Sequence, residues 1–243
     1  MAQVKMPKVE KALIRVFTDD ELKLLDAACS RPAVGRALTP DECKALGARD
    51  RAVLWLLLST GIRLSELCGL LFSDIDYEKG MIYVRGKGAK ERKVPFGKVA
   101  RQHLNTYVQY WRGESFSAED KHVFLTIFGR PFKSSTVRTI FKRLKRVADI
   151  TDKRVSAHTC RHWFAVRCIK NGVPSTVVQG WLGHEELEQI NTYVRLAEQD
   201  NQELYARHSP VDGLDMHHTI KGNRETLRAW RNARKREAKS PEE

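Results

Sequence analysis

The chain has 243 residues, with 43 Lys and Arg against 30 Asp and Glu, a formal charge of +13 and an isoelectric point near 9.7. This length suits one large domain with an appendage, and the excess of cations favours a polyanion such as nucleic acid as the partner. The N-terminus has no apolar signal segment, and the longest apolar run, residues 52–58, is too short to cross a bilayer. The sequence therefore excludes a membrane-spanning class.

The first predicted helix has a clear start. Thr18 and Glu21 have the spacing of a capping box, and Phe17 and Leu22 have that of a hydrophobic staple. We expect this helix to end at about Cys29.

A long, largely apolar helix is predicted next. Residues 30–42 carry two prolines and a glycine and are expected to form a loop. The helix then begins at about Cys43 or Arg49 and ends at Thr60, with apolar residues nearly all round, as in a buried helix. Gly61 follows it and can take the left-handed conformation that ends helices.

The remaining predicted elements are short. Residues 64–70 form a short helix, and the alternation of β-branched and aromatic residues over 74–96 predicts a β-hairpin with Lys87 near its tip. A smaller hairpin is predicted over 122–132. Further helices are expected over 98–112, with Val99, Leu104, Tyr107, Val108 and Trp111 in the core, over 134–148, 157–171, 174–182 and 198–207, and around residue 193. The predicted fold class is mainly α with a small antiparallel β-sheet (α+β).

A set of polar residues in the C-terminal two-thirds suits nucleophilic attack on a phosphodiester without a metal. Arginine forks bind non-bridging phosphate oxygens bidentately and can stabilise the charge of a pentacovalent phosphorane. A phenol becomes a nucleophile when a base or a cationic field activates it, and lysine or histidine can protonate the leaving hydroxyl. The six residues are Arg63, Lys87, His158, Arg161, His184 and Tyr193.

The segments that carry these residues follow one another in the order TGIRLSELCGL, VRGKGAKERKVP, SAHTCRHWFA, GWLGH and INTYVRL. This order resembles the tyrosine recombinase (lambda-integrase) family, over about residues 17–208. The resemblance implies that family's catalytic-domain fold. It also implies a site-specific DNA recombinase or integrase that cuts and rejoins DNA through a 3′-phosphotyrosyl intermediate, without metal, ATP or another cofactor. One departure is Cys160, which stands where leucine is usual in the family.

The resemblance implies a role for each residue at the phosphate and the nucleophile. Arg63 and Arg161 match the arginines that bind the scissile phosphate. Tyr193 matches the nucleophile, and Tyr205 is its one rival. His158 matches the histidine that assists proton transfer at the nucleophile.

Three further positions match the family's motifs. Lys87 matches the hairpin lysine that protonates the leaving 5′-oxygen, with Lys90 as its rival inside the motif. His184 matches the second histidine, which donates a hydrogen bond to the phosphate. Glu66 matches the acid that follows the first arginine, and its expected role is structural, to orient Arg63.

A strongly basic stretch over residues 130–170 contains twelve Lys and Arg and two acids. This density, next to the His158–Arg161 motif, predicts a surface that faces double-stranded DNA. The residues expected to bind DNA are Lys90, Arg92, Lys133, Arg138, Lys142, Arg143, Lys145 and Arg146.

The cysteines indicate the compartment. Five cysteines show no C-x-x-C pairing, which is typical of free thiols in a reducing compartment. Together with the family resemblance, this leads us to expect a cytoplasmic protein at the bacterial nucleoid. Cys160 lies between His158 and His162, but neither zinc spacing nor a second ligand cluster accompanies it, so no metal site is expected.

The expected organisation is a lead-in over 1–16, a catalytic domain over 17–210 and a charged tail over 211–243 with a predicted helix. The N-terminal core-binding domain, which clamps the other DNA face in most members of the family, is expected to be absent. The family resemblance also implies a homo-tetramer on two DNA sites. Two other functions stay open: a catalytically silent DNA-binding relic of an integrase, and a type IB topoisomerase-like enzyme.

Overall fold

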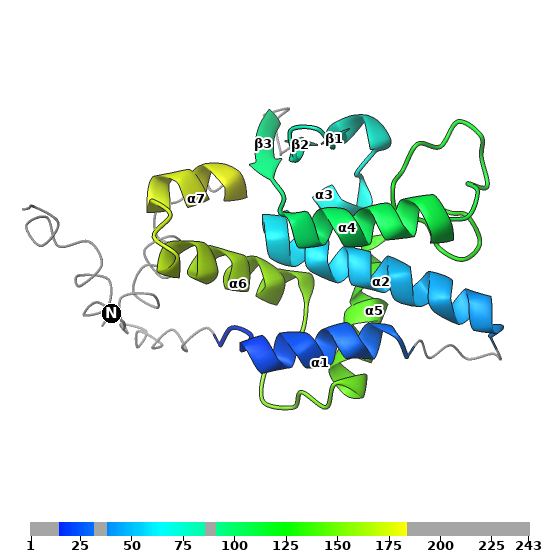
Figure 1. Cartoon of the computed structure of the whole chain (residues 1–243), viewed down its shortest axis with the longest axis horizontal. Helices are drawn as coiled ribbons and strands as arrows, with labels where there is room; N and C mark the ends of the chain where they lie inside the picture. The colour runs from blue at the N-terminus through cyan, green and yellow to red at the C-terminus, as the bar shows by residue number, and fades with distance from the viewer. Residues whose placement is uncertain (1–14, 32–37, 86–90, 184–243) are drawn as a thin grey trace, which may run out of the picture. The chain divides into compact units, whose positions relative to one another are not determined.

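The computed structural model describes residues 15–31, 38–85 and 91–183, which form a mainly helical unit with a three-stranded antiparallel sheet (Figure 1). The predicted fold class is confirmed. The helices are α1 (Asp19–Cys29), α2 (Pro40–Thr60), α3 (Leu64–Cys68), α4 (Lys98–Thr106), α5 (Ser134–Val147), α6 (Ala157–Lys170) and α7 (Ser175–Leu182). A 3-10 turn, η1 (Phe72–Asp74), and a π-helical turn, η3 (Tyr107–Trp111), accompany the strands β1 (Ile75–Asp76), β2 (Met81–Arg85) and β3 (Glu91–Pro95). Within these ranges, no helix is both long and apolar enough to cross a membrane.

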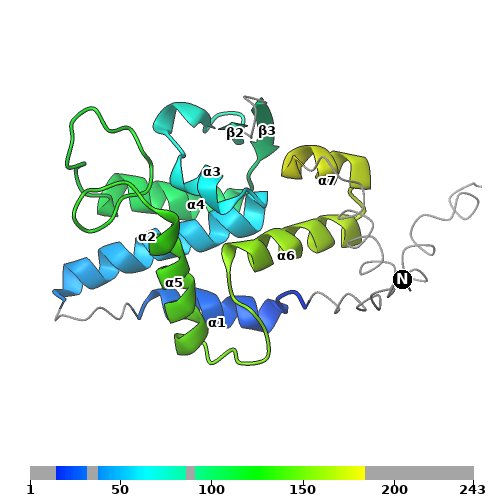
Figure 2. The same cartoon turned by 180° about the vertical axis from the view of Figure 1, so that it is seen from behind.

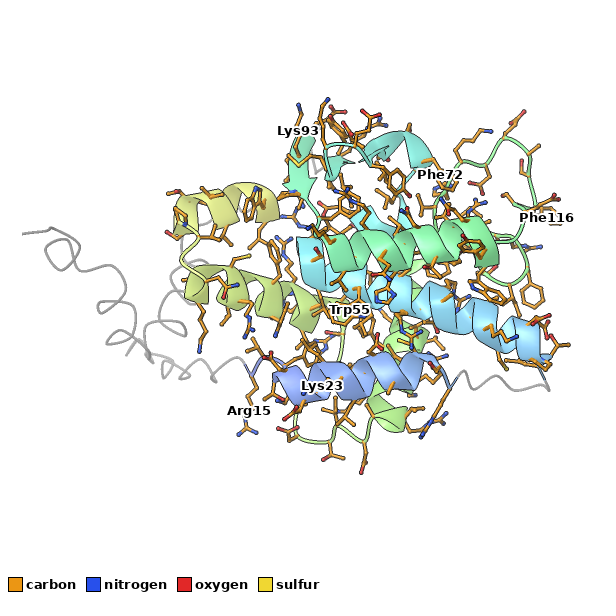
Figure 3. All side chains as sticks on the ribbon, in the orientation of Figure 1. Arg15, Lys23, Trp55, Phe72, Lys93 and Phe116 are labelled. Atoms are coloured by element: carbon orange, nitrogen blue, oxygen red, sulfur yellow. The ribbon has the colours of Figure 1, made fainter. Side chains whose placement is uncertain are left out.

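The start of α1 is the predicted capping box. Thr18 Oγ1 accepts a hydrogen bond from the backbone N–H of Glu21 at 3.2 Å, and the carboxylate of Glu21 accepts the N–H of Thr18 at 2.7 Å. These two bonds satisfy N–H groups that a helix start leaves without partners. Further along α1, Asp26 accepts a hydrogen bond from the indole N–H of Trp55 at 2.7 Å, which ties α1 to α2 (Figure 3).

Helix α2 begins at Pro40, earlier than the predicted start at residue 43 or 49. A second capping box explains the difference: the N–H of Glu42 donates to Thr39 Oγ1 at 3.2 Å, and the N–H of Thr39 donates to the Glu42 carboxylate at 2.9 Å. Proline suits the first helical position because its fixed φ is already helical. The end of α2 is as predicted, at Gly61 with φ of +60°.

The core surrounds the apolar half of α2, which packs against α1, α4 and α6 (Figure 1). Residues 52–54 and 56–58 of this half are fully or almost fully buried. On the other side α5 contacts α1, α3 and α6 (Figure 2). A buried ion cluster links α2 to α5: Asp50 lies 2.8 Å from Arg49 Nη2 and 2.8 Å from Arg143 Nη2. Two cations offset the cost of burying this carboxylate.

The sheet is ordered β1-β2-β3, and β2 and β3 form the predicted hairpin. Ile82 pairs with Val94 and Val84 pairs with Arg92, and the three apolar members of these pairs are buried. The alternation of the strands therefore turns one face of the hairpin toward the core. The connection at 86–90, with Lys87, lies outside the described residues.

Two further sequence predictions are wrong. Val99 was expected in the core, but it is 50% exposed and the adjacent Ala100 is buried, whereas Leu104 and Tyr107 are buried as expected. Residues 122–132 contain no strands of a second hairpin: one antiparallel bridge joins Leu125 to Pro131, and His122 forms a bridge with Leu71. The predicted helices around 193 and over 198–207, and the tail at 211–243, lie outside the described residues.

Candidate active site

A cleft of about 990 Å³ lies between the N-terminal turn of α6, one face of α5 and the connection from α2 to α3. Figure 2 shows α5 crossing beside the start of α6 on this side of the molecule. Three of the six predicted catalytic residues, Arg63, His158 and Arg161, line this cleft. They come from segments far apart in the sequence. Lys87, His184 and Tyr193 lie outside the described residues.

Arg161 is held in a fixed direction by two backbone carbonyls. Its Nη1 donates to the carbonyl of Gly61 at 2.6 Å, and its Nη2 donates to the carbonyl of Leu182 at 2.7 Å. Both carbonyls end a helix, α2 and α7, where the helix dipole favours a cation. Arg161 is only 5% exposed, and burying its charge would be costly without these two acceptors. The result is a preoriented guanidinium at the wall of the cleft.

Arg63 is fixed through Glu66. The Glu66 carboxylate accepts the backbone N–H of Arg63 at 2.6 Å and its Nη1 at 3.1 Å, while Arg63 Nη2 donates to the carbonyl of Gly183 at 2.7 Å. Burial raises the pKa of Glu66, but hydrogen bonds from Arg92 and Arg63 outweigh it and hold that pKa below its usual value. Glu66 thus stays ionised and restrains the direction of Arg63 through these hydrogen bonds.

Two glycines permit this close approach of helix ends. Gly61 has φ of +60°, and a Cβ there would lie 2.5 Å from Cδ1 of Phe164. Gly183 has φ of +63°, and a Cβ there would lie 3.1 Å from Cδ of Arg92. Both positions need the left-handed conformation that glycine adopts without strain.

His158 stands in the first turn of α6, one turn before Arg161. Ser156 caps this helix by accepting the N–H of Thr159 at 3.2 Å. Partial burial lowers the pKa of His158, and the charges of Arg154 and Arg161 lower it further. A neutral imidazole at this place is suited to accept a proton from a nucleophile at neutral pH.

Arg154 is a cleft residue that the sequence analysis missed. It lines the cleft beside His158, and its backbone carbonyl accepts the Thr159 hydroxyl at 2.8 Å, which fixes the turn before α6. The neighbouring Lys153 anchors the same turn by an ion pair to Glu21 at 2.8 Å. The sequence signal for Arg154 was its position four residues before His158, inside the basic stretch over 130–170.

Replacement Arg154→Gln is expected to raise the pKa of His158, because a cation that disfavours the imidazolium is removed. The pKa should stay below the ordinary histidine value, since burial and Arg161 remain. An NMR titration of the His158 ring in the protein without DNA measures the change. Arg146→Gln, an exposed α5 residue outside the cleft lining, is the control and should leave the titration unchanged. Identical titrations in wild type and Arg154→Gln would contradict the prediction.

The residues of α5 and its N-cap, Lys133, that were expected to bind DNA differ in the direction they face. Arg138, Lys142 and Lys145 follow the i, i+4, i+7 spacing of one face and line the cleft. Lys133 and Arg146 are exposed outside the cleft lining. Arg143 does not fit the expectation, because its side chain is turned inward, 10% exposed, and pairs with Asp50.

Arg92 likewise has a different place from the one expected. Its guanidinium binds the Glu66 carboxylate with two hydrogen bonds of 2.8 Å, and its side chain is 13% exposed. It shares the inward face of β3 with Val94, so the alternation of the strand explains its direction. Lys90, also expected to bind DNA, lies outside the described residues.

Neutralising Arg138 and Lys142 to glutamine is expected to flatten the salt dependence of DNA binding. If both side chains contact phosphates, the slope of log affinity against log salt should become less steep by about 2. Fluorescence anisotropy at several salt concentrations measures it. The control replaces Lys23 and Lys44, exposed lysines outside the cleft lining, and should keep the wild-type slope. Equal slopes for both pairs would mean that this face of α5 does not contact DNA.

The described residues contain no group of three or more His, Cys, Asp or Glu that could hold a metal ion. All five cysteines are free thiols. Burial raises the pKa of Cys160 well above its usual value and that of Cys29 to about 12, so both thiols stay protonated and unreactive.

Comparisons with known proteins agree with this geometry. The model of the phage integrase family matches residues 15–200. Tyrosine recombinase XerD of Halalkalibacterium halodurans is 32% identical over 208 residues, 85% of this chain and 66% of the relative. Tyrosine recombinase XerC of Oceanobacillus iheyensis is 35% identical over 212 residues, 86% of this chain and 65% of the relative. The chain thus spans about two thirds of the length of these relatives.

Solved structures show the same fold. The crystal structure of XerA recombinase superposes with a TM-score of 0.65 at 26% identity, over 84% of this chain and 66% of XerA. A lambda integrase dimer bound to a COC′ core site gives 0.54 at 21% identity, over 73% of this chain and 60% of the integrase chain. A mainly helical domain with a small sheet and a cleft that gathers two arginines and a histidine defines the catalytic-domain class. The chain belongs to the phage integrase family of tyrosine recombinases.

Proposed function

We propose that this protein is a site-specific DNA recombinase that cuts and rejoins double-stranded DNA through a 3′-phosphotyrosyl intermediate. One observation carries the proposal: Arg63, His158 and Arg161 line a single cleft beside the basic face of α5. Membership of a family whose relatives are named tyrosine recombinases supports the same function.

The proposed reaction exchanges one phosphodiester for another. The Tyr193 oxygen attacks the scissile phosphorus, and its proton passes to His158. The bond from phosphorus to the 5′-oxygen breaks, and Lys87 protonates that oxygen, which leaves a 3′-phosphotyrosyl link and a free 5′-hydroxyl. A 5′-hydroxyl from a partner duplex then attacks the link and releases the tyrosine.

In this scheme Arg63 and Arg161 bind the non-bridging oxygens of the phosphate, and His184 donates a hydrogen bond to them. The two guanidinium groups are already oriented by Glu66 and by helix-end carbonyls, so little reorganisation accompanies the build-up of charge in the transition state. The phosphotyrosyl link retains the energy of the broken bond, and neither ATP nor a metal ion enters the balance.

A nicked suicide duplex tests the function. The duplex is built on the sequence that the protein selects from random DNA, and the nick lets a short fragment leave after cleavage, which traps the intermediate. We expect a covalent protein–DNA adduct that survives denaturation. Binding without an adduct would indicate a catalytically silent relic. Relaxation of supercoiled DNA without strand exchange would indicate a type IB topoisomerase-like enzyme.

We further propose that residues 17–210 form the catalytic domain and that four protomers assemble on two DNA sites, in the cytoplasm at the bacterial nucleoid.

The tail, residues 211–243, is proposed to dock on a neighbouring protomer, with Leu227 and Trp230 at helical i, i+3 spacing as its anchor. Deletion of 211–243 should preserve binding to a single site but reduce tetramer formation, measured by sedimentation on cognate DNA. Equal tetramer formation by the full and truncated chains would refute docking of the tail.

A further inference from the structure

The C-terminal end of α7 carries an unusual arrangement of arginines. Its three consecutive carbonyls, at residues 181, 182 and 183, each accept a hydrogen bond from a different arginine. Arg92 Nε donates to the first at 2.7 Å, Arg161 Nη2 to the second at 2.7 Å, and Arg63 Nη2 to the third at 2.7 Å. A helix leaves its last carbonyls without partners inside the helix, and its dipole favours cations there.

Two of these three arginines are the predicted phosphate ligands, and the third has no role in the proposed chemistry. Arg92 does not line the cleft. Its side chain leaves the core-facing side of β3, whereas its neighbour Lys93 is exposed at the outer side of the strand (Figure 3). The Lys93 ammonium lies over the ring of Tyr83. The partly buried side chain of Arg92 packs closely on Gly183, where an added Cβ would lie 3.1 to 3.2 Å from three of its atoms.

Glu66 joins Arg92 to Arg63. Its side chain is only 5% exposed, and its two oxygens accept the two Nη groups of Arg92 at 2.8 Å as well as the backbone and side chain of Arg63. A bidentate pair of this kind restrains both partners in direction. Loss of Arg92 would leave Glu66 with one cation and would leave the first of the three α7 carbonyls without its donor.

We propose that Arg92 is a positioning residue, which acts through Glu66 and the end of α7 to hold Arg63 in its phosphate-binding direction. Helix α7 packs against β3, and Arg92 of β3 contacts both the Glu66 carboxylate of α3 and a backbone carbonyl of α7. The proposal deepens the proposed function, on which its catalytic part rests. Its structural part, the ordering of α3 and α7 by Arg92, does not depend on that function.

The matched variants are Arg92→Gln and Lys93→Gln, each of which removes one positive charge from β3. Arg92 faces inward and the adjacent Lys93 faces outward. Arg92→Lys keeps the charge but loses the planar fork and serves where Arg92→Gln is too unstable to fold. Thermal unfolding of each variant establishes the temperature at which all are folded. Three quantities are then compared with wild type: amide hydrogen exchange without DNA, the salt slope of DNA binding, and the single-turnover rate of adduct formation.

We expect faster hydrogen exchange over residues 64–68 and 175–182 in the Arg92 variants, an unchanged salt slope, and adduct formation slower by ~10²-fold, as for a small misplacement of a catalytic group. Lys93→Gln should leave exchange and the rate of the bound complex unchanged. In a Glu66→Gln background, Arg92→Gln should cost far less than it does alone, because the link is already broken.

Other outcomes would overturn the proposal. A salt slope that flattens by about 1 with unchanged exchange would make Arg92 a phosphate contact. Wild-type hydrogen exchange and a wild-type rate in the Arg92 variants would mean that Arg92 orders neither α3 nor α7. If the rate losses of Arg92→Gln and Glu66→Gln were fully additive, Arg92 would not act on Arg63 through Glu66. If wild type forms no adduct, the proposed function fails, and the exchange comparison still decides whether Arg92 orders α3 and α7.

Discussion

Replacement Tyr193→Phe is expected to abolish the covalent adduct and to leave DNA binding nearly intact. The hydroxyl is the proposed nucleophile, and the phenylalanine ring cannot form the phosphoester bond. The hydroxyl contributes little contact area, so affinity should change little. Denaturing electrophoresis of the suicide-duplex reaction measures the adduct, and anisotropy measures binding.

Tyr205→Phe and Tyr110→Phe are the controls for this loss. Tyr205 is the rival nucleophile, whereas Tyr110 is 74% exposed at the end of η3 and has no proposed role. Both controls should form adduct as wild type does. Adduct formation by Tyr193→Phe at the wild-type rate would move the nucleophile elsewhere, and its loss in Tyr205→Phe would identify the residue.

Replacement Arg161→Ala is expected to slow adduct formation by ~10³-fold or more, the cost of removing one preorganised group that stabilises developing charge. The same change removes the donor to the carbonyls of Gly61 and Leu182, and each unpaired buried carbonyl costs about 1–3 kcal/mol of folding free energy. Thermal unfolding and single-turnover rates must therefore be measured on the same preparation.

Two variants separate the catalytic loss from the structural one. Arg161→Lys keeps the charge, but one ammonium cannot reproduce the planar fork that spans both carbonyls, so its rate should also fall. Arg167→Ala removes an exposed arginine from the same helix, where it lies 3.5 Å from Asp19, and should leave the rate unchanged. A wild-type rate for folded Arg161→Ala would remove this residue from the site.

Local sequence signals predicted the elements well wherever short-range chemistry decides them. The capping box at Thr18 set the start of α1, and Gly61 set the end of α2, because both depend on residues within one helical turn. The same capping-box signal at Thr39 and Glu42 starts α2 at Pro40, earlier than the predicted start at residue 43 or 49. The prediction that Val99 lies in the core was wrong for another reason. Whether a helix position is buried depends on which neighbouring element covers that face of the helix.

The ordered motifs by themselves determined the family, the fold class and the candidate catalytic residues, because residue type and spacing carry that chemistry. The tertiary structure alone decided which basic residues face the cleft. Arg143 turns to a buried Asp50 and Arg92 to Glu66, while Arg154, absent from the motifs, lines the cleft beside His158. A cation's partner is chosen by the helix or strand face on which it lies and by what that face packs against. Those contacts join residues far apart in the sequence, and no local pattern specifies them.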